Sequence, residues 1–213
     1  MILCDVGNHS VSFFHDGKIW SITHEEFEKY STNEKVYYIC VNDELAQKLA
    51  ERKNFINLEP YFEFDTIYQG MGIDRIAACI SVNEGVIVDA GSAITVDIMS
   101  NSIHLGGFIL PGLSSYEESF KRISKRLEFR LNPNIDLSAL PQKTADALSY
   151  GVIKPILMIL RDIQKDKRIY FTGGDGKFFS KYFENSIYDR GLVFRGMQKT
   201  LKEKLQTSKE NQC

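Results

Sequence analysis

Short apolar runs bounded by glycine, asparagine and aspartate dominate the first part of the chain. Their β-branched and aromatic content predicts strands at residues 1–6, 11–15, 18–23 and 36–41. Asp16 and Gly17 separate the second run from the third and favour a tight hairpin turn. Apolar residues then recur at helical spacing, which predicts a helix over residues 44–53.

A second series of strands and helices follows in a similar order. The pattern predicts strands at residues 85–89, 93–99, 105–110 and 168–171, and helices at 73–82, 114–124, 144–162, 177–183 and 196–205. Pro155 lies inside the longest helical pattern and is expected to kink or interrupt it. Each series opens with an apolar strand that ends in Asp-x-Gly. The chain is therefore predicted to have two similar α/β halves that meet near residue 83.

The composition of the chain argues against several classes of function. The 213 residues are 43% hydrophobic, which is ample for a packed core, and 26 basic side chains balance 28 acidic ones. This balance gives no sign of a surface dedicated to nucleic acid or to an anionic membrane. The four cysteines lie far apart, so a zinc site or a disulfide framework is not expected. Without a long apolar run or a signal-like start, the protein is expected to be cytoplasmic.

The first candidate site is the turn at residues 5–10 (DVGNHS), which ends the first predicted strand. A glycine in such a turn lets backbone N–H groups approach an anion closely. The carboxylate of Asp5 beside it can hold a magnesium ion against phosphate oxygens. Taken alone, the motif is equally typical of a hairpin turn between two strands.

Two further glycine turns follow apolar strands, at residues 89–93 (DAGSA) and 172–176 (TGGDG). Asp89 offers a cation ligand, and Ser92 offers a hydroxyl and a backbone N–H for a phosphate. The glycines of the last turn allow flat packing against a base or ribose, and they exceed what one turn needs. Turns of this kind in two similar halves suit a nucleotide held between the halves, although each could be a simple tight turn.

A fourth motif, residues 72–75 (GIDR), opens a predicted helix. Asp74 could accept a proton from a substrate hydroxyl, and the guanidinium of Arg75 could bind an anion. The plainer interpretation is an acidic residue favoured by the helix dipole, with Arg75 exposed. The fifth motif, residues 106–112 (GGFILPG), could be only a strand between turns.

In this order and spacing, DVGN, GIDR, VDAGSA, GGFILPG and TGGDG resemble the type III pantothenate kinases over about residues 2–176. The resemblance implies an α/β fold of two ribonuclease-H-like (actin-like ATPase) halves. Each half would be a mixed sheet flanked by helices, with ATP in the cleft between them. The expected domains are residues 1–82, joined by the helix at 196–206, and residues 83–195.

The resemblance implies that the chain is an enzyme. It would use ATP to phosphorylate the primary hydroxyl of pantothenate to 4′-phosphopantothenate, the first step of coenzyme A biosynthesis. Asp74 would be the general base. Asp5 would bind Mg²⁺ and Asp89 a monovalent cation, K⁺ or NH₄⁺. A homodimer is also implied.

The remaining roles follow from the same resemblance. The residues expected to bind ATP are Asp5, Val6, Gly7, Asn8, His9, Ser10, Val11, Ser12, Ser92, Gly173 and Gly174. Those expected to bind pantothenate are Tyr68, Gly72, Ile73, Asp74, Arg75 and Thr144, the last from across the dimer interface. No nucleic acid or membrane is expected as a partner.

Four residues depart from the family pattern. Ser92 and Ile94 replace threonines, and little harm is expected from Ser92 because it keeps a hydroxyl. His9 stands where threonine is usual, and Ser12 stands where many members have lysine. Losing a lysine near the phosphates predicts weak ATP binding. The chain has no Gly-Lys-Ser/Thr loop, which excludes a P-loop kinase.

Two alternatives stay open. Another small-molecule kinase of the actin-like ATPase superfamily would usually need a longer chain. A catalytically inactive nucleotide-binding regulator would have no reason to keep Asp5, Asp74 and Asp89. The histidines outside the motifs, His15, His24 and His104, are expected to be structural or exposed to solvent.

Overall fold

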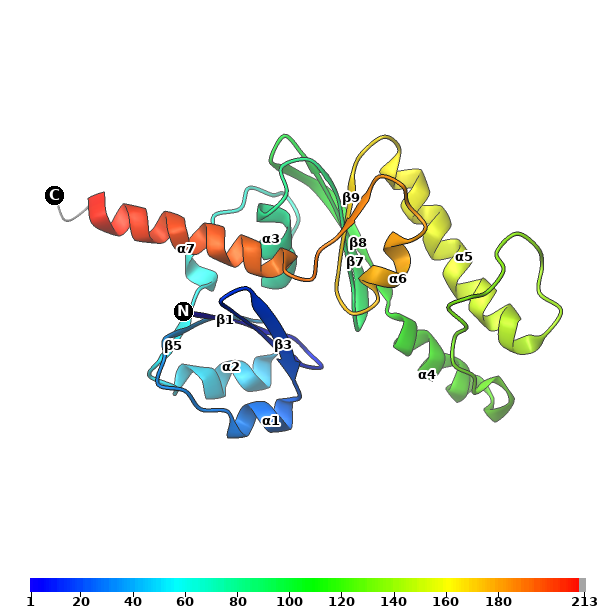
Figure 1. Cartoon of the computed structure of the whole chain (residues 1–213), viewed down its shortest axis with the longest axis horizontal. Coiled ribbons are helices and arrows are strands. Elements are labelled where there is room, and N and C mark those ends of the chain that lie inside the picture. The colour runs from blue at the N-terminus through cyan, green and yellow to red at the C-terminus, as the bar shows by residue number, and fades with distance from the viewer. Residues whose placement is uncertain (211–213) are drawn as a thin grey trace. The chain divides into compact units, whose positions relative to one another are not determined.

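The computed structural model of the chain describes residues 1–210, which form two compact units (Figure 1). Unit 1 consists of Met1–Asn83, Met99–Gly106 and the residues from Arg190 onward. Unit 2 consists of Glu84–Ile98 and Gly107–Asp189. Each unit has its own sheet and its own buried core.

Unit 1 is built on a five-stranded sheet with the strand order β3-β2-β1-β4-β5. The strands are β1 (Ile2–Val6), β2 (Val11–His15), β3 (Lys18–Ile22), β4 (Val36–Cys40) and β5 (Phe55–Asn57). The β2 strand pairs antiparallel with β1 and β3, whereas β4 runs parallel to both β1 and β5. Asp16 and Gly17, at φ of 46° and 79°, form the predicted hairpin turn.

Helices cover both faces of this sheet. They are α1 (His24–Lys29), α2 (Asp43–Ala50), α3 (Ile73–Ile80) and α7 (Leu192–Glu210), with a short 3₁₀ turn η1 (Glu59–Tyr61). Side chains at even positions of β1 join α1 and α2 in one buried cluster. On the other face, α7 packs against β1 and α3, and α3 packs against β4 (Figure 1). Because side chains alternate along a strand, Asp5 belongs to the face covered by α3 and α7.

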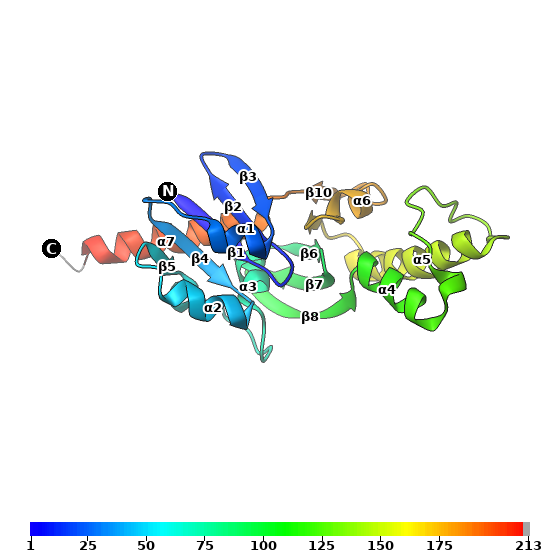
Figure 2. The same ribbon diagram turned by 90° about the horizontal axis from the view of Figure 1, so that it is seen from below.

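The second sheet has the strand order β10-β9-β6-β7-β8. Its strands are β6 (Gly85–Ala90), β7 (Ala93–Ser100), β8 (Ile103–Pro111), β9 (Ile169–Thr172) and β10 (Ser186–Tyr188). The β9 strand runs parallel to β6 and β10, while two-residue connections join β6 to β7 and β7 to β8, which lie side by side in Figure 2. This sheet is therefore also mixed. The tip of the β7–β8 hairpin, Met99–Gly106, groups with unit 1.

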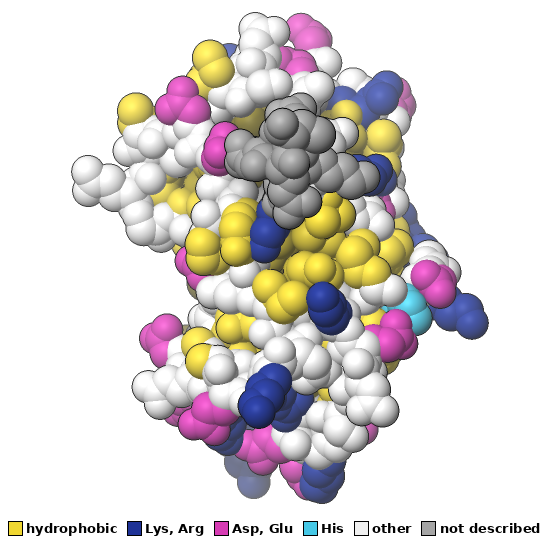
Figure 3. Space-filling view, turned by 90° about the vertical axis from the view of Figure 1, so that its left-hand side faces the viewer, with side chains coloured by type: hydrophobic (Ala, Val, Ile, Leu, Met, Phe, Trp, Pro, Cys, Tyr) yellow, Lys and Arg dark blue, Asp and Glu magenta, His cyan; other side chains and the backbone are white. Residues whose placement is uncertain are grey.

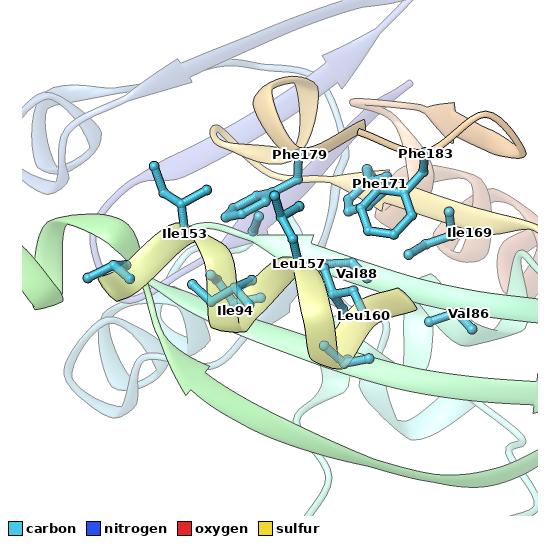
Figure 4. Close-up of a cluster of buried hydrophobic side chains, with 14 residues drawn as sticks. Val86, Val88, Ile94, Ile153, Leu157, Leu160, Ile169, Phe171, Phe179 and Phe183 are labelled. Atoms are coloured by element: carbon cyan, nitrogen blue, oxygen red, sulfur yellow. The ribbon is translucent and has the colours of Figure 1, made fainter. Parts of the chain in front are cut away.

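The core of unit 2 lies between its sheet and helix α5. The helices of this unit are α4 (Leu113–Ile123), α5 (Thr144–Gln164) and α6 (Gly176–Ser180), with a short turn η2 (Lys125–Leu127). Figure 4 shows Ile153, Leu157 and Leu160 of α5 against side chains of β6, β7 and β9. Even-numbered residues of β6 enter this cluster, so Asp89 points away from it.

Two mixed sheets flanked by helices confirm the predicted fold class. Three elements were not predicted, namely α1, β5 and β10. Pro155 was expected to kink or interrupt its helix. It does not interrupt it, because α5 is continuous from Thr144 to Gln164, and the kink stays a prediction. The packing of Val152 and Ile156 on the core outweighs the hydrogen bond that proline cannot make.

Three of the four cysteines lie among the residues that the structure describes. Cys4, Cys40 and Cys79 are free thiols, and Cys213 lies outside the described residues. Burial raises the pKa of the Cys4 thiol well above its ordinary value, and the charge of Asp5 adds to this shift. In the part of the chain that the structure describes, no helix is both long and apolar enough to cross a bilayer.

Figure 3 shows a face on which hydrophobic side chains gather, with Lys or Arg side chains among them. The large apolar side chains of unit 1 that are exposed include Met1, Tyr61, Ile67, Ile103, Leu105 and Leu205. The Lys204 ammonium lies 3.3 Å from the centroid of the Tyr61 ring. This cation–π contact joins α7 to η1.

Candidate active site

The turn between β1 and β2 is held by backbone hydrogen bonds. The Gly7 N–H donates to the Ser10 carbonyl at 3.1 Å, and Nε2 of His24 lies 3.0 Å from the Gly7 carbonyl oxygen. Asn8, His9 and Ser10 are exposed. The turn is therefore fixed at its base and open to a ligand at its tip. His24, predicted only as structural or exposed, supports this turn from α1.

Ser12 pairs across the strands with Asp5. Its hydroxyl oxygen lies 2.9 Å from that of Ser21, and an Arg190 guanidinium nitrogen lies 3.5 Å from the same Ser21 oxygen. The chain thus has a hydroxyl pair at the position where a lysine would bring a positive charge. Arg190 is the cation that approaches this pair.

Asp74 lies in the first turn of α3, and Gly72 caps that helix. The Asp74 Oδ1 atom accepts the Arg75 N–H at 2.8 Å and folds back over Gly72. A β-carbon at position 72 would lie 2.6 Å from this oxygen. Glycine is therefore needed for the carboxylate to take this position.

The start of α3 lies beside the carboxyl end of the parallel strands β1 and β4. A β-carbon at position 72 would lie 3.8 Å from Cγ1 of Val41, and the Val41 N–H donates to the Val6 carbonyl at 3.0 Å. Asp5 comes directly before Val6. Unit 1 therefore brings the Asp5 turn and the Asp74 helix start to one end of its sheet, where α/β proteins commonly bind ligands.

Arg75 is 6% exposed and packs against Tyr68. Its guanidinium carbon lies 4.8 Å from the centroid of the Tyr68 ring, and Nη1 donates to the Tyr68 hydroxyl at 3.3 Å. Tyr68 is half-buried, while Ile73 is 6% exposed and packs into the core. The Tyr68–Arg75 pair is thus a cationic and an aromatic group in contact, and Arg75 follows Asp74 directly in the first turn of α3.

In unit 2, the turn from Asp89 to Ser92 is enclosed by the start of α4. The Gly112 N–H donates to the Ser92 carbonyl at 3.1 Å, and the Ser115 hydroxyl donates to the same oxygen at 3.2 Å. A β-carbon at position 112 would lie 2.5 Å from that oxygen. The glycine of the GGFILPG motif therefore allows α4 to begin directly against this turn. The Ser92 side chain is exposed.

The glycine turn after β9 packs on the same strand end. Gly173 has a φ of 79°, and a β-carbon there would lie 2.5 Å from the Ala90 carbonyl oxygen and would also meet the Asp89 carboxylate. The Asp175 N–H donates to the Ala90 carbonyl at 2.9 Å. Gly174 is exposed and has open space where a β-carbon would be. Unit 2 thus gathers Asp89 with both glycine turns.

Negative charge accumulates around these turns of unit 2. Burial, and to a smaller extent the charge of Glu117, raises the pKa of the Asp175 carboxyl group above its ordinary value. Asp89 adds a third carboxylate at the same strand end. The raised pKa follows mainly from burial, which disfavours the charged form of a carboxyl group.

The predicted site residues are thus divided between the units. Asp5, Tyr68, Asp74 and Arg75 belong to unit 1, whereas Asp89, Ser92, Gly173, Gly174 and Thr144 belong to unit 2. Thr144 is the exposed first residue of α5. Sequence reasoning missed the contacts of His24 and His104, both of which reach predicted site segments of unit 1.

Comparison with known proteins gives a consistent family. Residues 56–165 match the family model described as type III pantothenate kinase. A type III pantothenate kinase of Campylobacter jejuni is 55% identical over 203 residues, covering 95% of this chain and 97% of that protein. Those of Wolinella succinogenes and Helicobacter pylori are 50% and 38% identical over 204 residues, again 95% of this chain and 97% and 92% of theirs.

Two solved structures resemble this chain to different degrees. A Campylobacter jejuni structure, described as a candidate transcriptional activator of the Baf family, has a TM-score of 0.89 and 53% identity, covering 97% of this chain and all of that one. The ethanolamine utilization protein EutJ of Carboxydothermus hydrogenoformans has a TM-score of 0.50 and 13% identity, over 92% of this chain and 88% of that one. The second likeness concerns the fold alone.

Proposed function

Since the chain belongs to the type III pantothenate kinase family, we propose that it transfers the γ-phosphoryl group of ATP to the primary hydroxyl of pantothenate. The products would be 4′-phosphopantothenate and ADP, in the first step of coenzyme A biosynthesis. The observation that carries this proposal is the grouping of Asp74 with the Tyr68–Arg75 pair at the start of α3, at the sheet end where the Asp5 turn lies. The family's role in biosynthesis and the free thiols support a cytoplasmic enzyme.

Pantothenate combines a carboxylate with a primary hydroxyl, and unit 1 offers a group for each. The Arg75 guanidinium suits the carboxylate, with Tyr68, Gly72 and Ile73 around it. The Asp74 carboxylate takes the hydroxyl proton as the oxygen attacks the γ-phosphorus. The Arg75 N–H bond to Oδ1 fixes the orientation of that carboxylate.

ATP would be held by the glycine turns. Residues 5–12 form the first phosphate loop, with the exposed tip of the turn at Asn8, His9 and Ser10. Ser92 binds a phosphate, and Gly173 and Gly174 border the nucleoside, where open space at Gly174 leaves room for it. Asp5 would hold Mg²⁺ and Asp89 would hold K⁺ or NH₄⁺, because carboxylate oxygens are ligands that such hard cations prefer. When bound, these ions neutralise charge on the phosphates. The expected domains, residues 1–82 with 196–206 and residues 83–195, stay a proposal. They differ from the compact units at Met99–Gly106 and at residues 190–195, which group with unit 1.

The direct test is an ADP-release assay with the purified chain. We expect ADP formation that requires pantothenate and that rises when K⁺ or NH₄⁺ replaces Na⁺ at constant ionic strength. ADP release that does not depend on pantothenate, but depends on another small alcohol, would favour a different kinase of the superfamily. Calorimetric binding of ATP without any ADP release would favour an inactive regulator.

We further propose that the enzyme is a homodimer with Thr144 near the partner's substrate. Unit 2 exposes many large apolar side chains, among them Ile109, Ile123, Phe129, Leu140 and Met158. Met158, on α5, is 59% exposed. We expect light scattering to give twice the chain mass of 24.4 kDa, and Met158→Glu to give monomers with weaker pantothenate binding. A wild-type monomer with full activity would rule the dimer out.

A further inference from the structure

We propose that His104, acting through Thr66, is a positioning residue for the Tyr68–Arg75 pair and thereby sets the affinity for pantothenate. This inference rests on the proposed function. It concerns a side chain of β8 that the sequence motifs did not single out. All the residues involved belong to unit 1.

The His104 ring is enclosed by aromatic side chains. It is 3% exposed, and its centroid lies 5.5 Å from that of Phe64 and 5.9 Å from that of Tyr68, which it meets edge-on. Nδ1 lies 2.7 Å from the Thr66 hydroxyl oxygen. One of its ring nitrogens also lies within 4.8 Å of the Cys79 sulfur and of an Asp97 carboxylate oxygen. A buried imidazole with a short polar contact among such neighbours is held in its orientation.

The Thr66 hydroxyl, which contacts His104, also bonds the backbone of Tyr68. The Tyr68 N–H donates to the Thr66 hydroxyl oxygen at 3.0 Å. Both residues lie in the irregular segment between η1 and α3, where no helix or strand bonds hold the chain. Ile67 between them is 95% exposed, so the segment touches the core on either side of it. The Thr66 hydroxyl is therefore the group that fixes the backbone position of Tyr68.

Tyr68 in turn lies between His104 and Arg75. The Tyr68 ring meets the imidazole in an edge-on contact. The guanidinium carbon of Arg75 lies 4.8 Å from the Tyr68 ring centroid, and Nη1 of Arg75 donates to the Tyr68 hydroxyl. The side-chain contacts therefore run from His104 through Tyr68 to the Arg75 guanidinium, the group proposed to bind the pantothenate carboxylate. Asp74 is bonded by the backbone N–H of Arg75 and not by its side chain. A loss at Thr66 would loosen the group that receives the pantothenate carboxylate and leave the phosphate turns of unit 1 untouched.

The test replaces the Thr66 hydroxyl by a methyl group. We expect Thr66→Val to raise the KM for pantothenate about fivefold, as for loss of one hydrogen bond, with the KM for ATP and kcat within about twofold. Thr66→Ser keeps the hydroxyl and should restore the wild-type KM. Thr32→Val is the matched control, because the Thr32 hydroxyl also accepts a backbone N–H in unit 1, from Glu34 at 3.1 Å. It should leave all three constants unchanged.

A second variant tests whether His104 acts through Thr66. His104→Phe keeps a ring against Phe64 and Tyr68 but removes both ring nitrogens. Because the buried Asp97 and Cys79 lie close to one of these nitrogens, thermal unfolding of this variant is measured beside its KM values. We expect the same rise in KM for pantothenate, and no further rise in the double variant, because coupled residues are not additive. If the two changes raised the KM for pantothenate additively, or if Thr66→Val left it unchanged, this inference would be wrong. Pantothenate-dependent activity of the wild-type chain would still support the proposed function. Absence of pantothenate-dependent activity in the wild-type chain would overturn the proposed function itself.

Discussion

Replacing Asp74 by asparagine is expected to lower kcat for pantothenate phosphorylation about 10²–10⁴-fold, the usual contribution of a general base. The amide has nearly the shape of the carboxylate, and its oxygen can still accept the Arg75 N–H that now meets Oδ1 at 2.8 Å. The helix start should therefore survive while the proton acceptor is lost. Steady-state ADP release, together with thermal unfolding, separates these effects.

Asp43→Asn is the matched control for this change. Asp43 also lies in the first turn of a unit 1 helix, α2, and is exposed. It should leave kcat unchanged. Near-wild-type turnover in Asp74→Asn would show that Asp74 is not the base, and a comparable loss in Asp43→Asn would point to a general effect on helix starts.

Replacing Gly196 by alanine is expected to destabilise the protein by about 2–3 kcal/mol, as overpacking of a buried contact does. Gly196 is buried where α7 crosses α3, and a β-carbon there would lie 2.6 Å from the Ala77 carbonyl carbon. The neighbour is backbone, so no rotamer change can relieve the clash. The better helix propensity of alanine, about 1 kcal/mol, offsets only part of this cost.

Thermal unfolding of Gly196→Ala should show a melting temperature lower by roughly 5–10 °C, from about 2–4 °C per kcal/mol at this chain length. Gly151→Ala is the control with the opposite sign. Gly151 is exposed inside α5, and nothing lies within 4 Å of its β-carbon position, so alanine should stabilise the protein slightly. If Gly196→Ala had the melting temperature of the wild type, α3 and α7 could not cross as closely as the structure shows.

The elements that sequence reasoning recovered are those with a clear periodic pattern. The β1–β3 meander follows from apolar runs and from Asp16 and Gly17 at the hairpin turn. Helix α1 was missed because it is short, although Thr23 and Glu26 form a capping box that is readable in the sequence. Strands β5 and β10 have three residues each, too few for any period, and they exist because a neighbouring parallel strand pairs with them.

The candidate site could be predicted only where its residues follow strands or open helices. Asp5, Asp74 and Asp89 stand at such positions, and their motifs are visible in the sequence. The partners that orient them come from distant segments. His24 contacts Gly7, 17 positions away in the sequence, and His104 contacts Thr66, 38 positions away. No local sequence pattern predicts either contact. Whether these side chains carry the roles assigned to them stays a prediction.

The interleaving of the chain between the units has a consequence for how the protein can be divided. Unit 1 takes its residues from three separate stretches, one of them the tip of a hairpin whose base belongs to unit 2. A fragment that stopped at Asn83 would lose both α7, which covers α3, and His104, which supports Tyr68. We therefore expect that the N-terminal stretch does not fold by itself, and that during synthesis unit 1 completes its core only after α7 has left the ribosome.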